Sequence, residues 1–333
     1  MNSFGKNFRV TLWGESHGVE LGVSIDGVVA GIELCEEDFK VDIDRRRSGR
    51  RGTTPRTEAD APTIVSGLFE GRTTGAPLTI TFKNESTRSK DYSALTTHFR
   101  PSHADRVASV KYGGHNDYRG GGHFSGRITL ALVAAGVVAK KILAAGVHFT
   151  TEIVELGGVK EATQFDEVVE AAIKRRDSVG GVVECRVSGV PTGWGEPFFD
   201  SVESRMAHIL FAVPAVKGVE FGAGFESARM SGLQNNDPII DAAGATSTNH
   251  AGGINGGISN GNDVVVRVAV KPTPSISAEQ QTYNTTSGCV EPLVIGGRHD
   301  AAIILRAGVV IEAAAAIALA DLKLSAVNPN FTL

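Results

Sequence analysis

The chain has 333 residues, of which 41% are hydrophobic, and it carries a formal net charge of −4. Its length allows one large domain or two ordinary ones, each with a substantial core. No uncharged apolar run reaches about 18 residues and the opening residues lack the apolar core of a signal peptide, so a soluble, cytoplasmic protein is expected. Cys35, Cys185 and Cys289 are isolated, which excludes a disulfide scaffold and offers no metal-ligand spacing.

The first third of the chain predicts short strands separated by glycine turns. Alternating β-type residues predict strands over 8–13, 21–29, 63–71 and 76–82. A helix is expected over 35–47, because carboxylates start this segment and arginines end it, in agreement with the helix dipole. A shorter helix is expected over 104–112.

The remainder mixes helices and strands without a regular βαβ rhythm. Small and apolar residues over 125–145 predict a helix that is buried on several sides. Further strands are expected over 147–156, 181–190 and 262–272, and helices over 165–176 and 301–324. This mixture favours an α+β fold over a doubly wound parallel sheet.

Two features concern the organisation of the chain as a whole. No low-complexity linker divides the chain, so a single domain is expected over 1–333. A strand followed by a Gly-Val turn occurs at both 22–34 and 183–195, which hints at an internal duplication.

Positive charge is concentrated between Arg45 and Arg127, a segment that contains 15 Lys and Arg residues but only 7 Asp and Glu residues. The rest of the chain is net acidic. Arginine dominates this block, and forked guanidinium groups suit recognition of phosphate or carboxylate. The sequence therefore predicts a local anionic ligand rather than general nucleic-acid binding.

The stretch "DYRGGGHFSGRIT" (117–129) sets three glycines before Ser125 and a predicted helix. Backbone N–H groups and a helix N-terminus placed together suit an anion. A flexible loop with Ser125 as helix N-cap explains the same residues equally well. The stretch matches neither a Walker loop nor the dinucleotide fingerprint.

Two loops carry a serine followed by a histidine: Ser16 and His17 in "WGESHG", and His103 in "FRPSHADR". Histidine titrates near neutrality, so the pattern predicts two positioned proton donors beside an anionic substrate. Neither histidine has a second metal ligand at helical spacing, and no Gly-x-Ser-x-Gly elbow occurs. Zinc and serine-hydrolase chemistry are therefore disfavoured.

Four further motifs occur in the chain: "DRRRSG", "NHAGGINGGIS", "KPTPSI" and "GGRHD". Together with the two histidine loops and the glycine stretch, and in their order along the chain, they resemble the motifs of the chorismate synthase family from Met1 to about Ala320. The resemblance implies a single-domain β-α-β sandwich that is usually a homotetramer. It also implies an anti 1,4-elimination of phosphate from 5-enolpyruvylshikimate 3-phosphate to chorismate, in the shikimate pathway. Reduced FMN is the implied cofactor, without net redox change, and NADP is an associated nucleotide. No metal is implied.

The resemblance also assigns roles to residues. His17 would protonate the departing phosphate, His103 would protonate the reduced flavin, and Asp300 would help the flavin N5 region to accept the ring proton. Ser16 and Ser125 would relay protons. The implied substrate contacts are Arg46, Arg47, Arg106 and Arg127, with Arg45 and Arg51 as further candidates. The implied flavin contacts are His123, Phe124, Ser125, Gln234, Asn235, Gly256, Lys271, Pro272, Thr273, Pro274, Ser275 and Arg298.

The chain departs from the family pattern in the glycine loop. Where many relatives read "GGGRSSARET", His123 and Ile128 replace an Arg and a Glu, which leaves the phosphate contacts of this loop open. "KYGGHNDYRGGG" has one residue more than the common form. No appended flavin-reductase domain is evident, so a monofunctional enzyme supplied with reduced FMN by an external reductase is expected.

Two other functions fit parts of the sequence. An FMN oxidoreductase with net electron transfer would consume an electron donor stoichiometrically. A nucleic-acid-binding protein could use Arg- and Gly-rich loops, but few aromatic residues lie near the basic block and the acidic remainder opposes it. Packing or surface roles are expected for His98, His148 and His208, whereas His250 and His299 flank the implied flavin segments.

Overall fold

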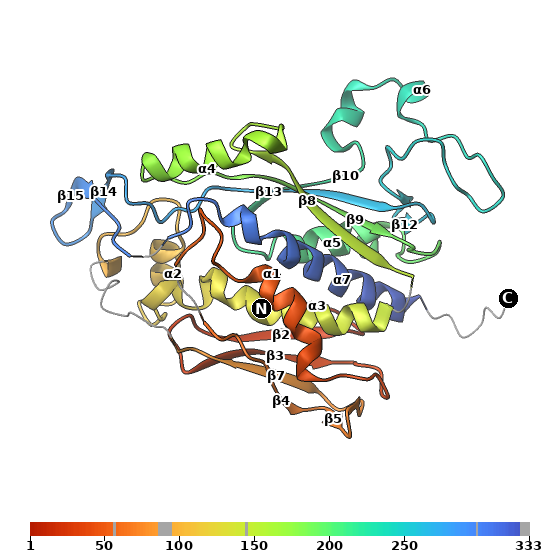
Figure 1. The fold of residues 1–333 in the computed structure, drawn as a ribbon, viewed down its shortest axis with the longest axis horizontal. Helices are drawn as coiled ribbons and strands as arrows, with labels where there is room; N and C mark the ends of the chain where they lie inside the picture. The colour runs from red at the N-terminus through yellow and green to blue at the C-terminus, as the bar shows by residue number, and fades with distance from the viewer. Residues whose placement is uncertain (56–57, 86–94, 144–145, 298, 327–333) are drawn as a thin grey trace.

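Two antiparallel sheets enclose a layer of helices (Figure 1). The computed structural model describes residues 1–55, 58–85, 95–143, 146–297 and 299–326. One sheet has the strand order β1-β2-β3-β7-β4, and the other has the order β10-β13-β9-β8. The predicted α+β class and β-α-β sandwich are confirmed. Within the described ranges, none of the helices combines the length and apolar character needed to span a membrane.

The first sheet contains β1 (Ser3–Phe4), β2 (Arg9–Gly14), β3 (Glu20–Asp26), β4 (Thr63–Ser66) and β7 (Leu78–Lys83). The strand expected over 63–71 is shorter than predicted. It breaks at Gly67, whose φ is 83° and where a Cβ atom would lie 2.6 Å from the Cα of Leu78. The chain beyond Gly67 instead forms a small hairpin of β5 (Leu68–Phe69) and β6 (Arg72–Thr73).

The second sheet contains β8 (His148–Leu156), β9 (Gly181–Ser188), β10 (Val216–Phe221) and β13 (Val264–Val270). Val183, Cys185 and Val187 of β9 are fully buried, as the period of two along a strand requires. The predicted strands at 147–156, 181–190 and 262–272 therefore agree with the structure to within a few residues.

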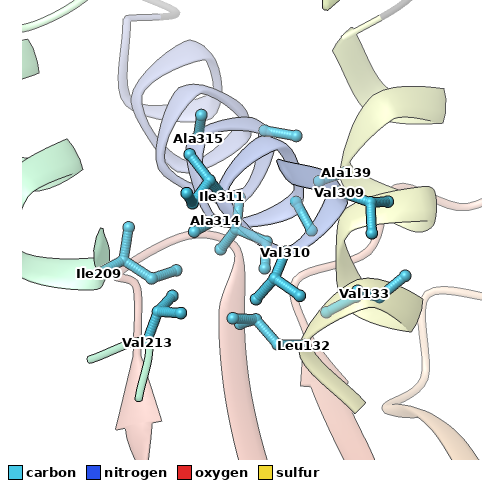
Figure 2. Packing of buried hydrophobic residues seen from close by; sticks show 14 of the residues in the cluster. Leu132, Val133, Ala139, Ile209, Val213, Val309, Val310, Ile311, Ala314 and Ala315 are labelled. Atoms are coloured by element: carbon cyan, nitrogen blue, oxygen red, sulfur yellow. The ribbon is translucent and has the colours of Figure 1, made fainter. Parts of the chain in front are cut away.

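The middle layer consists of α1 (Lys40–Arg46), α3 (Thr129–Leu143), α5 (Val202–Leu210) and α7 (Gly308–Ser325). α3 and α7 lie side by side, and a Cβ atom at Gly136 of α3 would overlap Ala313 of α7. Figure 2 shows Leu132 of α3 and Ile209 of α5 beside α7. All residues of α7 from Val309 to Leu322 are buried. The helix is therefore covered on every side, which explains why its sequence is apolar all round.

Short 3₁₀ turns shorten three of the predicted helices. The segment predicted over 35–47 divides into η1 (Glu36–Phe39) and α1. η4 (Gly126–Ile128) precedes α3, and η8 (Ile303–Arg306) precedes α7. The other predicted helices are observed as α2 (Asp105–Lys111) and α4 (Phe165–Lys174).

The two sheets share one connectivity, which supports the predicted internal duplication. Read from β2, the first sheet runs β2-β3-β7-β4; read from β8, the second runs β8-β9-β13-β10. In both, the strands lie in the order first, second, fourth and third along the chain, and a long helix, α3 or α7, follows the last one. The two segments with the shared sequence pattern, 22–34 and 183–195, include parts of β3 and β9, the second strand of each set.

A long connection between β10 and β13, residues 222–263, is called here the arm. It carries η7 (Gly224–Arg229), α6 (Gly232–Asn235), β11 (Ile254–Asn255) and β12 (Ile258–Ser259). Figure 1 shows the arm at the opposite end of the molecule from α2 and from the hairpin of β14 (Gln280–Asn284) and β15 (Cys289–Leu293). The other short turns are η3 (Arg119–Phe124), η5 (Ala162–Gln164) and η6 (Phe198–Asp200).

Candidate active site

A cavity of about 700 Å³ lies at the ends of several elements, where loops from distant parts of the sequence meet. The loop after β2, the segment before α2, the glycine loop before α3, the end of α5 and the turn before α7 all contribute to its wall. The sequence-predicted residues in the wall are Ser16, His17, Arg46, Arg47, His103, His123, Phe124, Ser125, Arg127, Lys271, Thr273, Pro274, Ser275 and Asp300.

The triglycine segment packs directly against both predicted proton donors. Gly120, Gly121 and Gly122 all have positive φ (60°, 85° and 55°), which other residue types rarely adopt. A Cβ atom at Gly120 would overlap the ring of His17, and one at Gly121 would lie 3.4 Å from Cε1 of His103. The segment therefore needs glycine for two reasons. Its backbone has positive φ, and it lies too close to His17 and His103 to leave room for side chains.

Hydrogen bonds fix this loop to the turn that carries His17. The Ser16 N–H donates to the Gly122 carbonyl at 3.1 Å, and Nδ1 of His123 lies 2.8 Å from the Gly14 carbonyl oxygen. At the end of the loop, the Ser125 hydroxyl accepts from the Arg127 N–H at 3.2 Å, as an N-cap does. Ser125 thus starts the helical segment, as the sequence predicts, and it also lines the cavity.

Two buried arginines share one carboxylate in the cavity wall. Arg46 and Arg127 are 3% and 8% exposed, and both approach Asp60, with Nη1 of Arg46 at 3.7 Å and Nη1 of Arg127 closer. Burial and the like charges of Arg306 and Arg127, opposed by Asp60, lower the pKa of Arg46 below its ordinary value. Arginine stays protonated in proteins, so two positive charges here share one carboxylate, and an anion in the cavity would add a counter-charge.

A second arginine–carboxylate pair stands in the wall next to α7. Arg306 donates from Nε and Nη2 to the two oxygens of Asp300, at 3.1 and 2.9 Å. Oδ1 of Asp300 also accepts the N–H of Thr54 at 3.0 Å. Such bidentate pairing holds the carboxylate in one orientation.

Among the buried polar atoms of the wall, Nε of Arg47 and Oγ1 of Thr273 have no hydrogen-bond partner within the described part of the chain. Buried polar atoms are normally satisfied, so these two are suited to a bound group. Apolar side chains line another part of the wall, including Leu12, Leu132, Ile209, Val213 and Val216. The cavity can therefore accept both an anionic molecule and a flat, largely apolar ring.

Some predicted contacts lie elsewhere in this chain. Arg106 is exposed on α2, while Gln234, Asn235 and Gly256 belong to the arm, and none of these four lines the cavity. Pro272 is not in the wall, although both of its neighbours are. Arg298 lies outside the described residues. The further candidates Arg45 and Arg51 bind carboxylates away from the cavity, Glu312 and Glu170 respectively.

Histidine placement also differs from expectation at one position. His208 packs edge-on against Phe4 with ring centroids 5.3 Å apart, as a packing residue would, but it also lines the cavity. His299 lines the cavity, whereas His250 lies in the arm, where its Nδ1 is 3.3 Å from Oδ1 of Asp237.

Sequence reasoning missed several charged residues: Glu58, Asp60, Arg100 and Arg306 in the cavity wall, and Asp105 behind it. Arg100 and Asp105 flank His103 in the quoted motif "RPSHAD" and could have been found there. Asp60 and Arg306 reach the site only through contacts with residues distant in sequence, so no local pattern marks them.

Comparison with known proteins identifies the family. A family model described as chorismate synthase matches residues 8–324. The chain belongs to the chorismate synthase family. A chorismate synthase from Chitinophaga pinensis is 60% identical over 324 residues, covering 97% of each chain. A chorismate synthase from Agathobacter rectalis is 44% identical over 96% of this chain and 94% of its own.

A solved structure supports the same membership. A crystal structure of chorismate synthase aligns with a TM-score of 0.75 and 26% identity, over 98% of this chain and 95% of that one. Chorismate synthases are carbon–oxygen lyases, and membership places this chain in that enzyme class.

Proposed function

We propose that the chain eliminates phosphate from 5-enolpyruvylshikimate 3-phosphate in the anti 1,4 sense, giving chorismate, with reduced FMN and no net redox change. The observation that carries this proposal is the position of His17 and His103. Both pack against one triglycine loop, inside a cavity whose wall holds the buried Arg46 and Arg127.

The charge of the cavity suits a substrate with one phosphate and two carboxylates. Arg46, Arg127 and Arg306 are fixed by protein contacts, so they provide positive charge without losing side-chain freedom when the substrate binds. Arg47 offers an unsatisfied Nε. The turns that lead into α3 and α7 both line the cavity, which adds two positive helix ends to the same space.

His17 would act as the general acid. Its side chain is 9% exposed and lines the cavity, so a proton on its ring is shielded from bulk water. Donation of this proton to the departing phosphate oxygen would contribute about 10²–10⁴-fold to the rate. Ser16 is 1% exposed and is fixed to the same loop, which suits a relay position.

His103 and Asp300 would take part in proton transfer at the flavin. Burial lowers the pKa of His103 below its ordinary value, with the charges of Arg100 and Lys271 acting in the same direction and Asp105 opposing them. A lowered pKa favours the neutral imidazole, which can take up a proton and return it. Asp300, oriented by Arg306, would help the flavin N5 region to accept the proton of the substrate ring.

The residues present fit reduced FMN. Thr273 has an unsatisfied buried hydroxyl, Lys271 supplies a positive charge, and the triglycine loop presents backbone where side chains would obstruct a ring system. These residues, with His123, Ser125 and Ser275, would hold it. When bound, reduced FMN supplies transient electron density to the allylic system of the substrate.

We also propose that the protein is a homotetramer. Gln234, Asn235 and Gly256 lie in the arm, outside the cavity of their own chain. If they contact FMN, they do so across a subunit interface. We also propose one catalytic unit over 1–333, cytoplasmic, which receives reduced FMN from an external reductase. One continuous cluster of buried side chains, from Phe8 to Leu322, supports the single unit.

An anaerobic assay tests the proposal. Purified protein with photoreduced FMN and 5-enolpyruvylshikimate 3-phosphate should release inorganic phosphate and chorismate in equal amounts over many turnovers per flavin. Absence of both products would refute it. Consumption of one donor equivalent per turnover would instead favour an FMN oxidoreductase with net electron transfer.

A further inference from the structure

The side chain of His103 is held by a chain of charged and polar groups behind the cavity wall. Its Nδ1 lies 2.6 Å from Oδ1 of Asp105, in a close polar contact. Asp105 is buried and, unlike His103, does not line the cavity. The carboxylate therefore contacts the imidazole from the side away from the ligand space.

Asp105 is itself fixed by Arg100. Nε of Arg100 donates to Oδ2 and Nη2 donates to Oδ1, both at 2.7 Å, in the forked geometry of a strong pair. Nη1 of Arg100 donates to Ser275 Oγ at 2.9 Å. Burial would raise the pKa of Asp105, but the hydrogen bonds from Arg100 and His103 outweigh it and keep that pKa well below its usual range. Asp105 is thus an anion that accepts hydrogen bonds and donates none.

The backbone before His103 is also constrained. Ser102 has φ of 59°, a left-handed conformation that is costly for a residue other than glycine. Its carbonyl accepts a hydrogen bond from Nζ of Lys271 at 2.7 Å. On the opposite side of the ring, Cε1 and Nε2 of His103 face Gly121 of the triglycine loop. The ring is held between these groups, with Arg100, Asp105 and Lys271 as the charged groups around it.

We propose that Asp105 is a positioning residue that fixes His103 as the tautomer protonated on Nδ1, so that Nε2 is the nitrogen presented to the triglycine loop and the cavity. An ionised carboxylate beside Nδ1 can only accept a hydrogen bond from the imidazole and cannot donate one, so it favours a proton on Nδ1. Proton exchange with the cavity then occurs only at Nε2. The effect on turnover rests on the proposed function, whereas the tautomer does not.

Nitrogen NMR of the apoenzyme labelled with [15N]histidine tests the tautomer without activity. The His103 signals are assigned by their loss in His103→Asn. We expect a protonated Nδ1 and an unprotonated Nε2 in the wild type at neutral pH. In Asp105→Asn, one amide oxygen cannot serve both Arg100 and His103, and the amide NH₂ favours the opposite tautomer. The His103 pKa should also fall by about one unit or more, because a neighbouring negative charge is lost.

Three variants complete the design. Asp105→Glu keeps the carboxylate and should restore the Nδ1–H tautomer. Asp200→Asn, which removes an exposed partner of Lys6 far from His103 in the sequence, should leave the His103 signals unchanged. In the anaerobic assay, Asp105→Asn should lower kcat at least about tenfold with little change in KM, since Asp105 does not contact the ligand space.

The outcomes separate the two proposals. A wild-type spectrum with the proton on Nε2 overturns the positioning role, even if no Asp105 variant folds. A folded Asp105→Asn protein with unchanged tautomer and titration also overturns it. If the spectra agree with expectation but the wild type forms no chorismate, the proposed function fails and the positioning role remains.

Discussion

Gly120 and His17 occupy adjoining space so closely that any side chain on Gly120 would displace the imidazole. We therefore expect Gly120→Ala to reduce kcat more than tenfold in the anaerobic assay. The matched control is Gly114→Ala: Gly114 has φ of 80° and nothing within 4 Å of its added Cβ. Both variants carry the strain of a left-handed alanine, about 1–2 kcal/mol, so equal activity losses would contradict the claim that contact with His17 is the cause.

Removal of either imidazole should slow turnover without unfolding the protein. His17→Ala and His103→Ala are each expected to lower kcat more than tenfold, because a proton transfer is lost. Circular dichroism should show an intact fold. His148→Ala, on an exposed position of β8, is the control and should retain wild-type rates. Wild-type rates in both site variants would remove the assigned roles.

Loss of Asp60 should destabilise the protein. In Asp60→Asn, the buried Arg46 and Arg127 lose their shared counter-charge, and removing one partner of a buried pair costs about 3–5 kcal/mol. Urea unfolding measures this cost. Glu226→Gln breaks an exposed pair with Arg229 and should cost less than about 1 kcal/mol. Equal losses in the two variants would show that the arginines do not depend on Asp60.

Stability should decrease in mild acid because of His103. Its pKa in the folded protein lies below the ordinary 6.5, so the unfolded chain binds more protons in that range. The free energy of unfolding therefore rises with pH between the folded pKa and about 6.5, and its His103 contribution is lost as pH falls through this window. Urea titrations at several pH values should show a shallower dependence in His103→Asn. An identical slope would contradict a lowered pKa.

Many of the strands and helices followed from local patterns, because alternation and apolar periodicity are properties of neighbouring residues. Helix α5, strand β10 and the hairpin of β14 and β15 were not predicted. The ends of elements were less predictable. The helix expected from 125 begins at Thr129, since Ser125 caps a 3₁₀ turn first. The strand expected over 63–71 ends at Ser66, because the next residue, Gly67, approaches the backbone of Leu78, a contact that no local pattern encodes.

The same limit applies to the site. The histidine and glycine motifs were readable because their members are adjacent in sequence. The shared carboxylate of Asp60 and the pair of Arg306 with Asp300 depend on how distant segments meet. The sequence consequently brought out the two histidine loops, the basic block and Asp300, but not Asp60 or Arg306.

The contact between Gly136 and Ala313 has a mechanical consequence. With backbone so close to backbone, α3 and α7 have no room to slide past each other, and interiors packed this tightly resist compression. The start of α3 and the turn before α7 line the cavity, so this part of its wall is rigid. Adjustment of the cavity to the size of its occupants must therefore come from other parts of the wall, such as the loops that carry His17 and His103.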